Sequence, residues 1–228
     1  IQRGDADMAI CGGAECKVQP MGMLRQHLLG RLNKTSNDSP ASAVRPFDAD
    51  GAGTVVAEGG GLLILEEYEH ARARGAPIYA EIAGFGASQD AYKITEPDPT
   101  GRSYALAISR ALADAGAAPA DVGLIVPNGL GIASHDRAEL AGLQFAFGEQ
   151  LAEVPLAPIK AQVGNLAAGC GVDVAAAVLA LHHGTIPPAI NTRKPLDDVR
   201  LNVSPEARPA EMRLAVASIY SLGGQNGA

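Results

Sequence analysis

Residues 166–183 read LAAGCGVDVAAAVLALHH, and this stretch decides the fold. Nearly every position is apolar or small, so a helix here would be hydrophobic on all sides. A helix of that kind is buried inside a domain rather than lying on its surface. We therefore predict a central helix over 166–183. Asn165 comes immediately before it and is the expected N-cap, because Asn side chains accept the free N–H groups of a first helical turn.

Strand-like runs alternate with helix-like runs along the rest of the chain, which is typical of an α/β domain with a mainly parallel sheet. The strand-like runs are almost continuous in Val, Ile, Leu and Ala, as expected for strands covered on both faces. They occupy 6–12, 55–66, 78–87, 122–127 and 213–220. Apolar residues at helical spacing predict helices over 103–115 and 136–147. The polar segment 33–42 is expected to be a loop.

Length and composition restrict the class of protein. The chain has 228 residues, 47% hydrophobic residues and 27 Gly, which is typical of one large domain, or one and a half ordinary ones, with closely packed α/β layers. Its net charge of −7 provides no basic surface for nucleic acid. The apolar runs end before the ~20 residues needed to cross a bilayer, and no signal peptide precedes them. We expect a cytoplasmic protein without a membrane span.

Cysteine usage gives no sign of a metal site. Cys11, Cys16 and Cys170 have neither a second cysteine pair nor a histidine at the spacing of metal ligands. We therefore expect reduced, buried thiols and no bound metal.

Four loops combine polar side chains with glycine, so that backbone N–H groups could approach a ligand. They are 45–48 (RPFD), 127–131 (PNGLG), 160–165 (KAQVGN) and 221–226 (SLGGQN). By itself NGLG is typical of a simple turn, because Asn and Gly tolerate positive φ. Lys160 is either a surface cation or, as the apolar run before it suggests, a partly buried one that needs a partner. His135, next to the 127–131 loop, is the histidine best placed for a chemical role.

Taken in order along the chain, six segments resemble the β-ketoacyl-[acyl carrier protein] synthases, the condensing enzymes of fatty-acid and polyketide synthesis. The segments are GDADMAICGGAE (4–15), RPFDADGAGTVVAEGGGLLILEEYEHARARGAPIYAEIAGFG (45–86), PNGLGIASHDRAEL (127–140), KAQVGNLAAGCG (160–171), GTIPPAIN (184–191) and SLGGQNG (221–227). The resemblance implies a thiolase-type fold, in which two similar α/β halves stack as α-β-α-β-α layers. It divides the chain into the end of the N-terminal half (1–75) and the complete C-terminal half (76–228).

The resemblance also shows what is altered at the reaction centre. The family's nucleophilic Cys lies upstream of the segment that resembles 1–7, so it is expected outside this chain. The family's two catalytic His positions match Asn128 and Asn165. An amide can donate a hydrogen bond, but it cannot shuttle a proton near neutral pH. Chain-initiating and chalcone-type synthases use Asn at the second position, so Asn128 is the sharper departure. Loss of such a donor costs roughly 10²–10³-fold in rate.

Other positions of the family's site are retained or replaced. Lys160 matches a catalytic Lys, which gives Asn128, Asn165 and Lys160 as the positional equivalents of the catalytic residues. Leu222, Gly223 and Gly224 match the substrate-binding loop, where Leu222 replaces an aromatic gate. Asp136, Glu139 and Asn226 are also retained. The resemblance implies no bound cofactor or metal, because the substrates are carried as phosphopantetheine thioesters.

Three functions remain open at this stage. The first is an impaired synthase homologue, similar to the chain-length factors that pair with an active ketosynthase. The second is an active 3-oxoacyl-carrier-protein synthase, in which Asn128 and Asn165 polarise the thioester. The third is a structural or interaction module. The resemblance implies acyl carrier protein as a partner, and either a homodimer or a heterodimer with a ketosynthase. A chain that matches only part of the family should also expose apolar surface.

Overall fold

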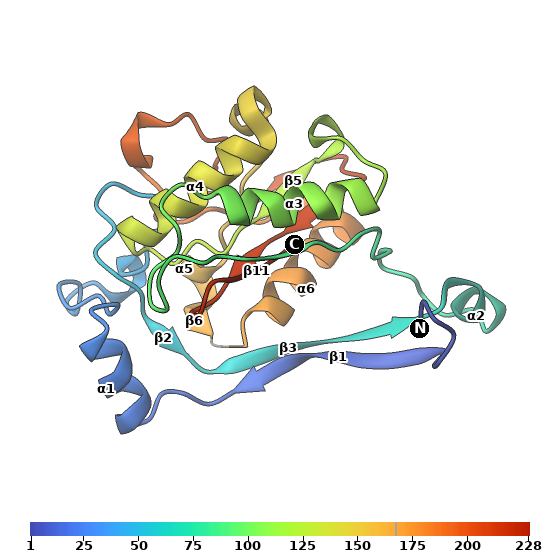
Figure 1. The fold of residues 1–228 in the computed structure, drawn as a ribbon, viewed down its shortest axis with the longest axis horizontal. Helices are drawn as coiled ribbons and strands as arrows, with labels where there is room; N and C mark the ends of the chain where they lie inside the picture. Colours follow the sequence, from blue (N-terminus) through green and yellow to red (C-terminus); the bar gives the residue numbers. More distant parts are fainter. Residues whose placement is uncertain (167) are drawn as a thin grey trace.

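A computed structural model describes residues 1–166 and 168–228 (Figure 1). The helices are α1 (Pro20–Leu28), α2 (Tyr68–Ala73), α3 (Arg102–Asp114), α4 (Ala133–Phe147), α5 (Lys160–Val163) and α6 (Cys170–His183). The strands are β1 (Met8–Glu15), β2 (Val56–Ala57), β3 (Gly59–Glu66), β4 (Ala87–Gln89), β5 (Leu124–Val126), β6 (Asn165–Leu166), β7 (Thr185–Ile186), β8 (Arg208–Pro209), β9 (Ala215–Ala217), β10 (Ile219–Tyr220) and β11 (Gln225–Gly227). Short 3₁₀ turns lie at Pro40–Ser42, Pro119–Asp121, Gly148–Ala152 and Leu196–Asp198.

The elements stack in layers around α6. Helices α3 and α4 form an outer layer, and the strands β5, β9, β10 and β11 lie beneath them. Helix α6 follows, and the two-stranded ribbon of β1 and β3 lies on its far side (Figure 1). The predicted central helix is therefore present and contacts both strand layers. It is not buried on all sides, because the Leu179 side chain is 47% exposed.

The start of α6 differs from the prediction. The helix begins at Cys170, with Gly169 as its N-cap residue, and residue 167 lies outside the described part of the chain. Asn165 belongs to β6 and pairs in parallel with Val56 of β2, and its backbone N–H donates to the Val55 carbonyl. The predicted N-cap role of Asn165 is thus wrong, because strand pairing with a distant segment fixes its backbone in place of the cap.

Two glycines allow α6 to lie directly on β3. A Cβ atom added at Gly171 would overlap the carbonyl oxygen of Gly61, and one added at Gly61 would overlap the backbone of Gly171 and Val172. Neither position has room for a side chain. The helix and the ribbon therefore meet backbone to backbone.

The sheet is mixed rather than mainly parallel, which corrects the prediction. Strands β5 and β9 are parallel, and so are β2 and β6. Strands β1 and β3 form an antiparallel ribbon from Met8↔Glu66 to Glu15↔Gly59. The order β10-β11-β4 is antiparallel throughout. Short returns at the C-terminal end allow antiparallel neighbours where the alternation of strands and helices predicts parallel ones.

The helical periodicities are confirmed. Helix α3 matches the prediction for 103–115 within one residue, and α4 begins three residues before the predicted 136–147. Their apolar faces meet the sheet at Ile108 and Leu143, which are fully buried together with Ile125 of β5. The strands predicted over 122–127 and 213–220 are present in shorter form as β5 and as β9 with β10. The predicted 33–42 loop contains only a 3₁₀ turn.

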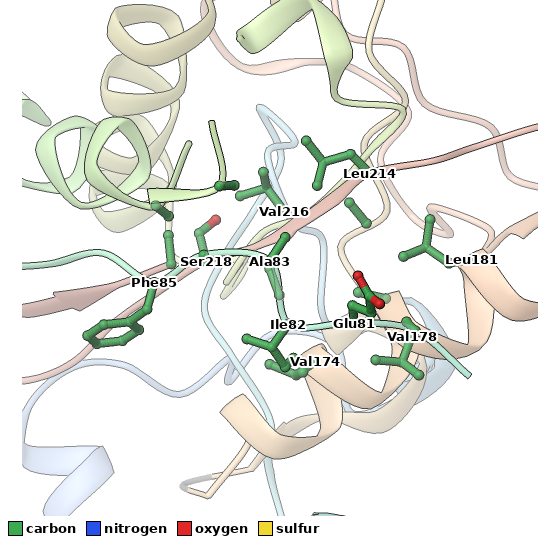
Figure 2. Close-up of a pocket in the computed structure, with 18 of the residues that line it drawn as sticks. Glu81, Ile82, Ala83, Phe85, Val174, Val178, Leu181, Leu214, Val216 and Ser218 are labelled. Atoms are coloured by element: carbon green, nitrogen blue, oxygen red, sulfur yellow. The ribbon is translucent and has the colours of Figure 1, made fainter. Parts of the chain in front are cut away.

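The strand predicted over 78–87 is largely absent. Only its last residue belongs to a strand, β4, and no backbone hydrogen bond within the described part of the chain involves 77–84. Gly84 and Gly86 hold the segment against α3, where added Cβ atoms would overlap the backbone of Ala111 and Ala107. An apolar cavity of about 560 Å³ separates it from β9 and α6. Figure 2 shows Ile82 near Val174 of α6, with Val216 of β9 on another wall.

The outward face of the ribbon is apolar and open to solvent. Met8, Ile10, Leu62 and Ile64 are 45%, 75%, 66% and 69% exposed, respectively. This exposure agrees with the expectation that the chain presents apolar surface. None of the helices in the described residues has the length and apolar character needed to cross a membrane.

The cysteines do not follow their prediction. Cys16 and Cys170 are exposed, and only Cys11 is partly buried; all three are free thiols. Cys11 lies in β1, Cys16 in the connection that follows it, and Cys170 at the start of α6. The expectation of buried thiols is therefore wrong for Cys16 and Cys170.

Substitution of Gly171 tests the backbone contact. We expect Gly171→Ala to lower the free energy of unfolding by about 1–3 kcal/mol, because an inserted methyl group pushes α6 away from β3. Gly227→Ala is the matched control, since its Cβ would meet only Ile219 Cγ2 at 3.9 Å. Urea denaturation measures both changes. Equal stability of the two variants would contradict the contact.

Hydrogen exchange tests the unpaired segment. The amides of 78–84 should exchange with little protection, because they have no backbone partner in the described residues. Those of β5 should be strongly protected, because this strand is buried and paired with β9. Residue-resolved exchange is the measurement, and comparable protection in the two segments would show that 78–84 pairs with a strand in solution.

Candidate functional site

A cavity of about 250 Å³ with a mixed polar and apolar lining collects three of the residues that the family resemblance indicates. Asn128, Asn165 and Leu222 line it together, although they follow β5, begin β6 and follow β10, respectively. Other side chains on its wall include Gln26, Arg31, Leu130, His135 and Tyr220. Lys160, Gly223 and Gly224 are not part of this lining. The cavity is therefore the candidate site. Of the six predicted site residues, three line it and the other three lie outside its lining.

Two carboxylates of α4 hold the 128–131 loop. Glu139 accepts hydrogen bonds from the backbone N–H groups of Asn128 (2.7 Å) and Gly129 (2.8 Å). Asp136 accepts those of Leu130 (2.9 Å) and Gly131 (3.0 Å), and also that of Phe47. All four N–H groups of the loop are thus engaged. This loop does not offer free N–H groups to a ligand, which corrects the expectation from its Asn-Gly composition.

The two carboxylates are fully sequestered from solvent. Asp136 and Glu139 are each 1% exposed, and the Tyr104 hydroxyl donates to Glu139 at 2.6 Å. Burial raises the pKa of each to about 7, while the hydrogen bonds that each accepts oppose the rise. Their spacing of three residues places them on the same side of α4, facing the loop.

Asn128 lines the cavity on a fixed backbone. Its residue is 3% exposed and its main chain is held by Glu139. Asn165 is partly buried, and its main chain is held by Val55 through β-pairing. Both amides can donate neutral hydrogen bonds into the cavity, but neither can carry a proton through a reaction at neutral pH.

Lys160 is buried and paired, as one of the two sequence-based alternatives predicted. Its Nζ lies 2.7 Å from Oδ2 and 3.0 Å from Oδ1 of Asp173 on α6, and the two side chains are 2% and 4% exposed. Burial raises the pKa of Asp173, and the charge of Lys160 opposes that rise. The ion pair connects the first residue of α5 to α6, so Lys160 supports the site without lining it.

Gly223 and Gly224 shape the turn after β10. Their φ angles are +90° and +80°, a region in which residues with a Cβ are strained. The Gly223 N–H donates to the Ile94 carbonyl, and the Asp90 N–H donates to the Gly224 carbonyl. This turn therefore positions Leu222, whose side chain is 42% exposed at the edge of the cavity.

The 45–48 loop is structural in this arrangement. Asp48 is 2% exposed and accepts backbone N–H groups from Asp50, Arg193 and Lys194. It joins the loop to the segment before the last 3₁₀ turn, and none of its residues lines the cavity.

Three functional candidates at the cavity differ in how visible they are in the sequence. His135 was singled out from its position beside the 127–131 loop, and it does line the cavity. Arg31 and Tyr220 were missed. Tyr220 immediately precedes the 221–226 loop, so extending that loop by one residue would have included it. Arg31 carries no local signal. In the described part of the chain, no group of His, Cys, Asp or Glu is arranged to hold a metal ion.

Comparison with known sequence families finds two matches. Residues 79–193 match the family described as the C-terminal domain of β-ketoacyl synthase. Residues 1–71 match the N-terminal domain of the same enzymes. Among curated proteins, the chain is 39% identical to 3-oxoacyl-[acyl-carrier-protein] synthase 2 of Vibrio cholerae, over 100% of this chain and 56% of that protein. The chain thus spans about half the length of the curated relatives it matches.

Solved structures give the same result. The chain superposes with a TM-score of 0.95 and 31% identity on a type II polyketide acyl-carrier protein complex with its ketosynthase bound to the hexaketide, covering 100% of this chain and 56% of that one. With the ishigamide ketosynthase/chain length factor the TM-score is 0.88 and the identity 34%, covering 99% and 54%. The thiolase-type α/β fold expected from the sequence is confirmed by these neighbours.

Breaking the buried ion pair tests its supporting role. We expect Asp173→Leu to lower the free energy of unfolding by about 3–5 kcal/mol, because it leaves the Lys160 cation buried and unpaired. Lys160→Met combined with Asp173→Leu should restore much of that loss, since both charges are then removed. Lys194→Met, which breaks an exposed pair with Asp50, is the control and should change stability little. A double variant no more stable than Asp173→Leu would contradict this account.

Proposed function

Because the chain belongs to the β-ketoacyl synthase family, we propose that it acts in fatty-acid or polyketide synthesis as a catalytically impaired, chain-length-factor-like partner of an active ketosynthase. Its relatives include 3-oxoacyl-acyl-carrier-protein synthases and a ketosynthase/chain length factor structure. The division between an N-terminal half at 1–75 and a C-terminal half at 76–228 remains a prediction. The altered reaction centre, and not the fold, distinguishes a partner from an enzyme.

The observation that carries this function is the pair of amides at the cavity. Asn128 and Asn165 line the same space, at the positions where the family resemblance places two histidines. Imidazole can become a cation that donates a charged hydrogen bond, and it can transfer a proton. An amide donates only a neutral hydrogen bond and transfers no proton near neutral pH. Decarboxylation of a malonyl thioester needs a donor that stabilises the developing enolate. Two neutral donors supply a weaker version of that stabilisation.

The residues that support the cavity are consistent with a subunit that keeps the shape of the site and has lost its catalytic groups. Lys160 is held by Asp173 outside the cavity lining, and the 128–131 loop is held by Asp136 and Glu139. The contacts to the loop use its main-chain N–H groups and do not involve the side chain at position 128. A subunit that shapes a shared acyl pocket needs such a frame, and it does not need a proton shuttle.

Leu222 suits a role in bounding an acyl chain. It lies at the edge of the cavity on a turn set by Gly223 and Gly224, where the family carries an aromatic gate. A leucine leaves more space than a phenyl ring at the same position. We propose that the acyl chains reach this site as phosphopantetheine thioesters of acyl carrier protein, with no further cofactor. One structural neighbour is such a carrier protein in complex with its ketosynthase.

The alternative is an active 3-oxoacyl-carrier-protein synthase, with its nucleophile outside this chain. One observation favours it, namely that an imidazole is present at the cavity. His135 lies on the wall that also carries Asn128. Burial lowers its pKa to about 4, so its ring is neutral at physiological pH and can donate or accept one hydrogen bond.

Decarboxylation and association measurements distinguish these functions. Supplied with malonyl-acyl carrier protein, the chain should release no CO₂ above background, and it should co-elute with a ketosynthase in size-exclusion chromatography. CO₂ release that is abolished by Asn165→Ala would establish the active enzyme instead. A homodimer that binds neither ketosynthase nor carrier protein would favour a structural module. Asn37→Ala, an exposed change outside the cavity lining, is the control for both assays.

A further inference from the structure

The apolar cavity of about 560 Å³ beside α6 lies between two stretches of backbone that have no strand neighbour on the side facing it. One is β9, which pairs with β5 and with no other strand of the described residues. Ser218 donates its N–H toward β5, to the Val126 carbonyl, so the alternate residues Ala215 and Ala217 direct theirs away from β5. The other stretch is 77–84, which has no backbone hydrogen bond within residues 1–166 and 168–228. Open strand edges pair readily with another extended chain.

The cavity continues the line of β11 through the sheet. Strand β11 lies between β10 and β4 and is antiparallel to both. At its end, Ala228 and Gly86 exchange two backbone hydrogen bonds of 2.9 and 3.0 Å. Segment 77–84 leads toward β4, and β9 leads into β10. The space between 77–84 and β9 is therefore the place that one further stretch of strand would take.

The register of β11 fixes which residues such a strand would face. Gly227 lies opposite Ile219 of β10 and Ala87 of β4. Continued beyond β11, the same register reaches 214–217 on one side and 82–85 on the other. All of these positions line the cavity. We call the space between 214–217 and 82–85 the slot, and its length corresponds to about four residues in extended conformation.

Apolar side chains from two helices border the slot. Helix α6 lies on one face of the strand layer and α3 on the other (Figure 1). Figure 2 shows Val174 and Val178 of α6 near Ile82, with Val216 of β9 on another wall. Ile82 is 59% exposed although it lines the slot, so the slot is open to an occupant. Strands covered on both faces are apolar throughout, and the same composition suits a strand placed here. The lining residues of the helices are Ala111, Leu112, Ala115, Val174, Ala177, Val178 and Leu181.

The two sides of the slot are held apart. Strand β9 is bound to β5. On the other side, the Phe85 N–H donates to Oδ2 of Asp114 on α3 at 2.9 Å. Gly84 and Gly86 lie so close to α3 that an added Cβ atom at either would overlap its backbone. Closure of the slot by its own walls would break these contacts, so an added strand is the way to pair both edges.

We propose that the slot is a docking site for an extended peptide segment of a partner, with about four consecutive apolar residues lying antiparallel to β9 and to 82–85. The backbone groups on both sides supply hydrogen bonds, and the helices bury the side chains, as in other cases of strand addition. β-Branched residues are favoured in the segment, because they pack well in strands. A small apolar molecule would fill the same volume but leave the backbone groups unpaired. This inference does not depend on the function proposed above.

The experiment is a calorimetric titration of the chain with the peptide acetyl-AVVVVKK-amide, whose lysines keep it soluble. We expect a Kd on the order of 10–100 µM. The control peptide has the same sequence with N-methyl groups on two adjacent valines, which removes one N–H donor toward each side of the slot. It should bind about tenfold more weakly or worse, because two backbone hydrogen bonds are lost while the apolar surface is kept.

One substitution blocks the slot from α6. Val178→Trp places a large ring among the lining residues, and we expect it to weaken peptide binding about tenfold or more, because the space is already filled. Leu179→Trp is the matched control on the same helix, since Leu179 is 47% exposed and does not line the cavity. It should bind the peptide as the unaltered chain does. Circular dichroism confirms that each variant is folded.

Hydrogen exchange of the unaltered chain tests the docking geometry without any variant. Gly86 donates its N–H toward β11, so in an extended segment Ile82 and Gly84 direct theirs into the slot. Saturating peptide should slow exchange of these two amides by about tenfold or more, while the amides of α2 stay unchanged. Absence of peptide binding, equal affinity for the N-methylated peptide, or binding without added protection at 82 and 84 would overturn the proposal.

Discussion

One contact between two backbones organises the molecule. Gly61 of β3 and Gly171 of α6 meet without side chains between them, which places α6 directly on the ribbon. Asp173 follows on the same helix and pairs with Lys160, and this pair fixes α5. Residue 165, just beyond α5, then enters the short pairing with β2 at the cavity. The position of Asn165 therefore depends on the packing of α6 against β3. A displaced α6 would move Asp173, then Lys160 and α5, and finally Asn165.

The parts of the fold that could be predicted from the sequence are those set by local spacing. The apolar faces of α3 and α4 are periodic within each helix, so their existence and bounds follow from a single segment. The strand over 78–87 has the right composition, but a strand also needs a neighbour that supplies hydrogen bonds, and its neighbour is not visible in local sequence. Asn165 failed as an N-cap for the same reason, because its backbone partner Val55 lies far along the chain.

The candidate site was predictable only in part. Asn128, Asn165 and Leu222 were found through family resemblance, and the cavity brings them together. The burial of Lys160 could be anticipated from the apolar residues around it, although its partner Asp173 could not. Arg31 and Tyr220 come from opposite ends of the chain, and each is an ordinary residue in its own segment. Only the folded arrangement brings both residues to the same cavity.

Helix α4 holds the 128–131 loop by hydrogen bonds to the main chain of the loop. Asp136 and Glu139 hold the loop through main-chain N–H groups, which every residue other than proline possesses. The side chain at 128 contributes nothing to that anchorage. A lineage can therefore exchange the reactive group at this position in a single step while the loop stays in place. Loss or gain of chemistry here leaves the four main-chain hydrogen bonds of the loop in place.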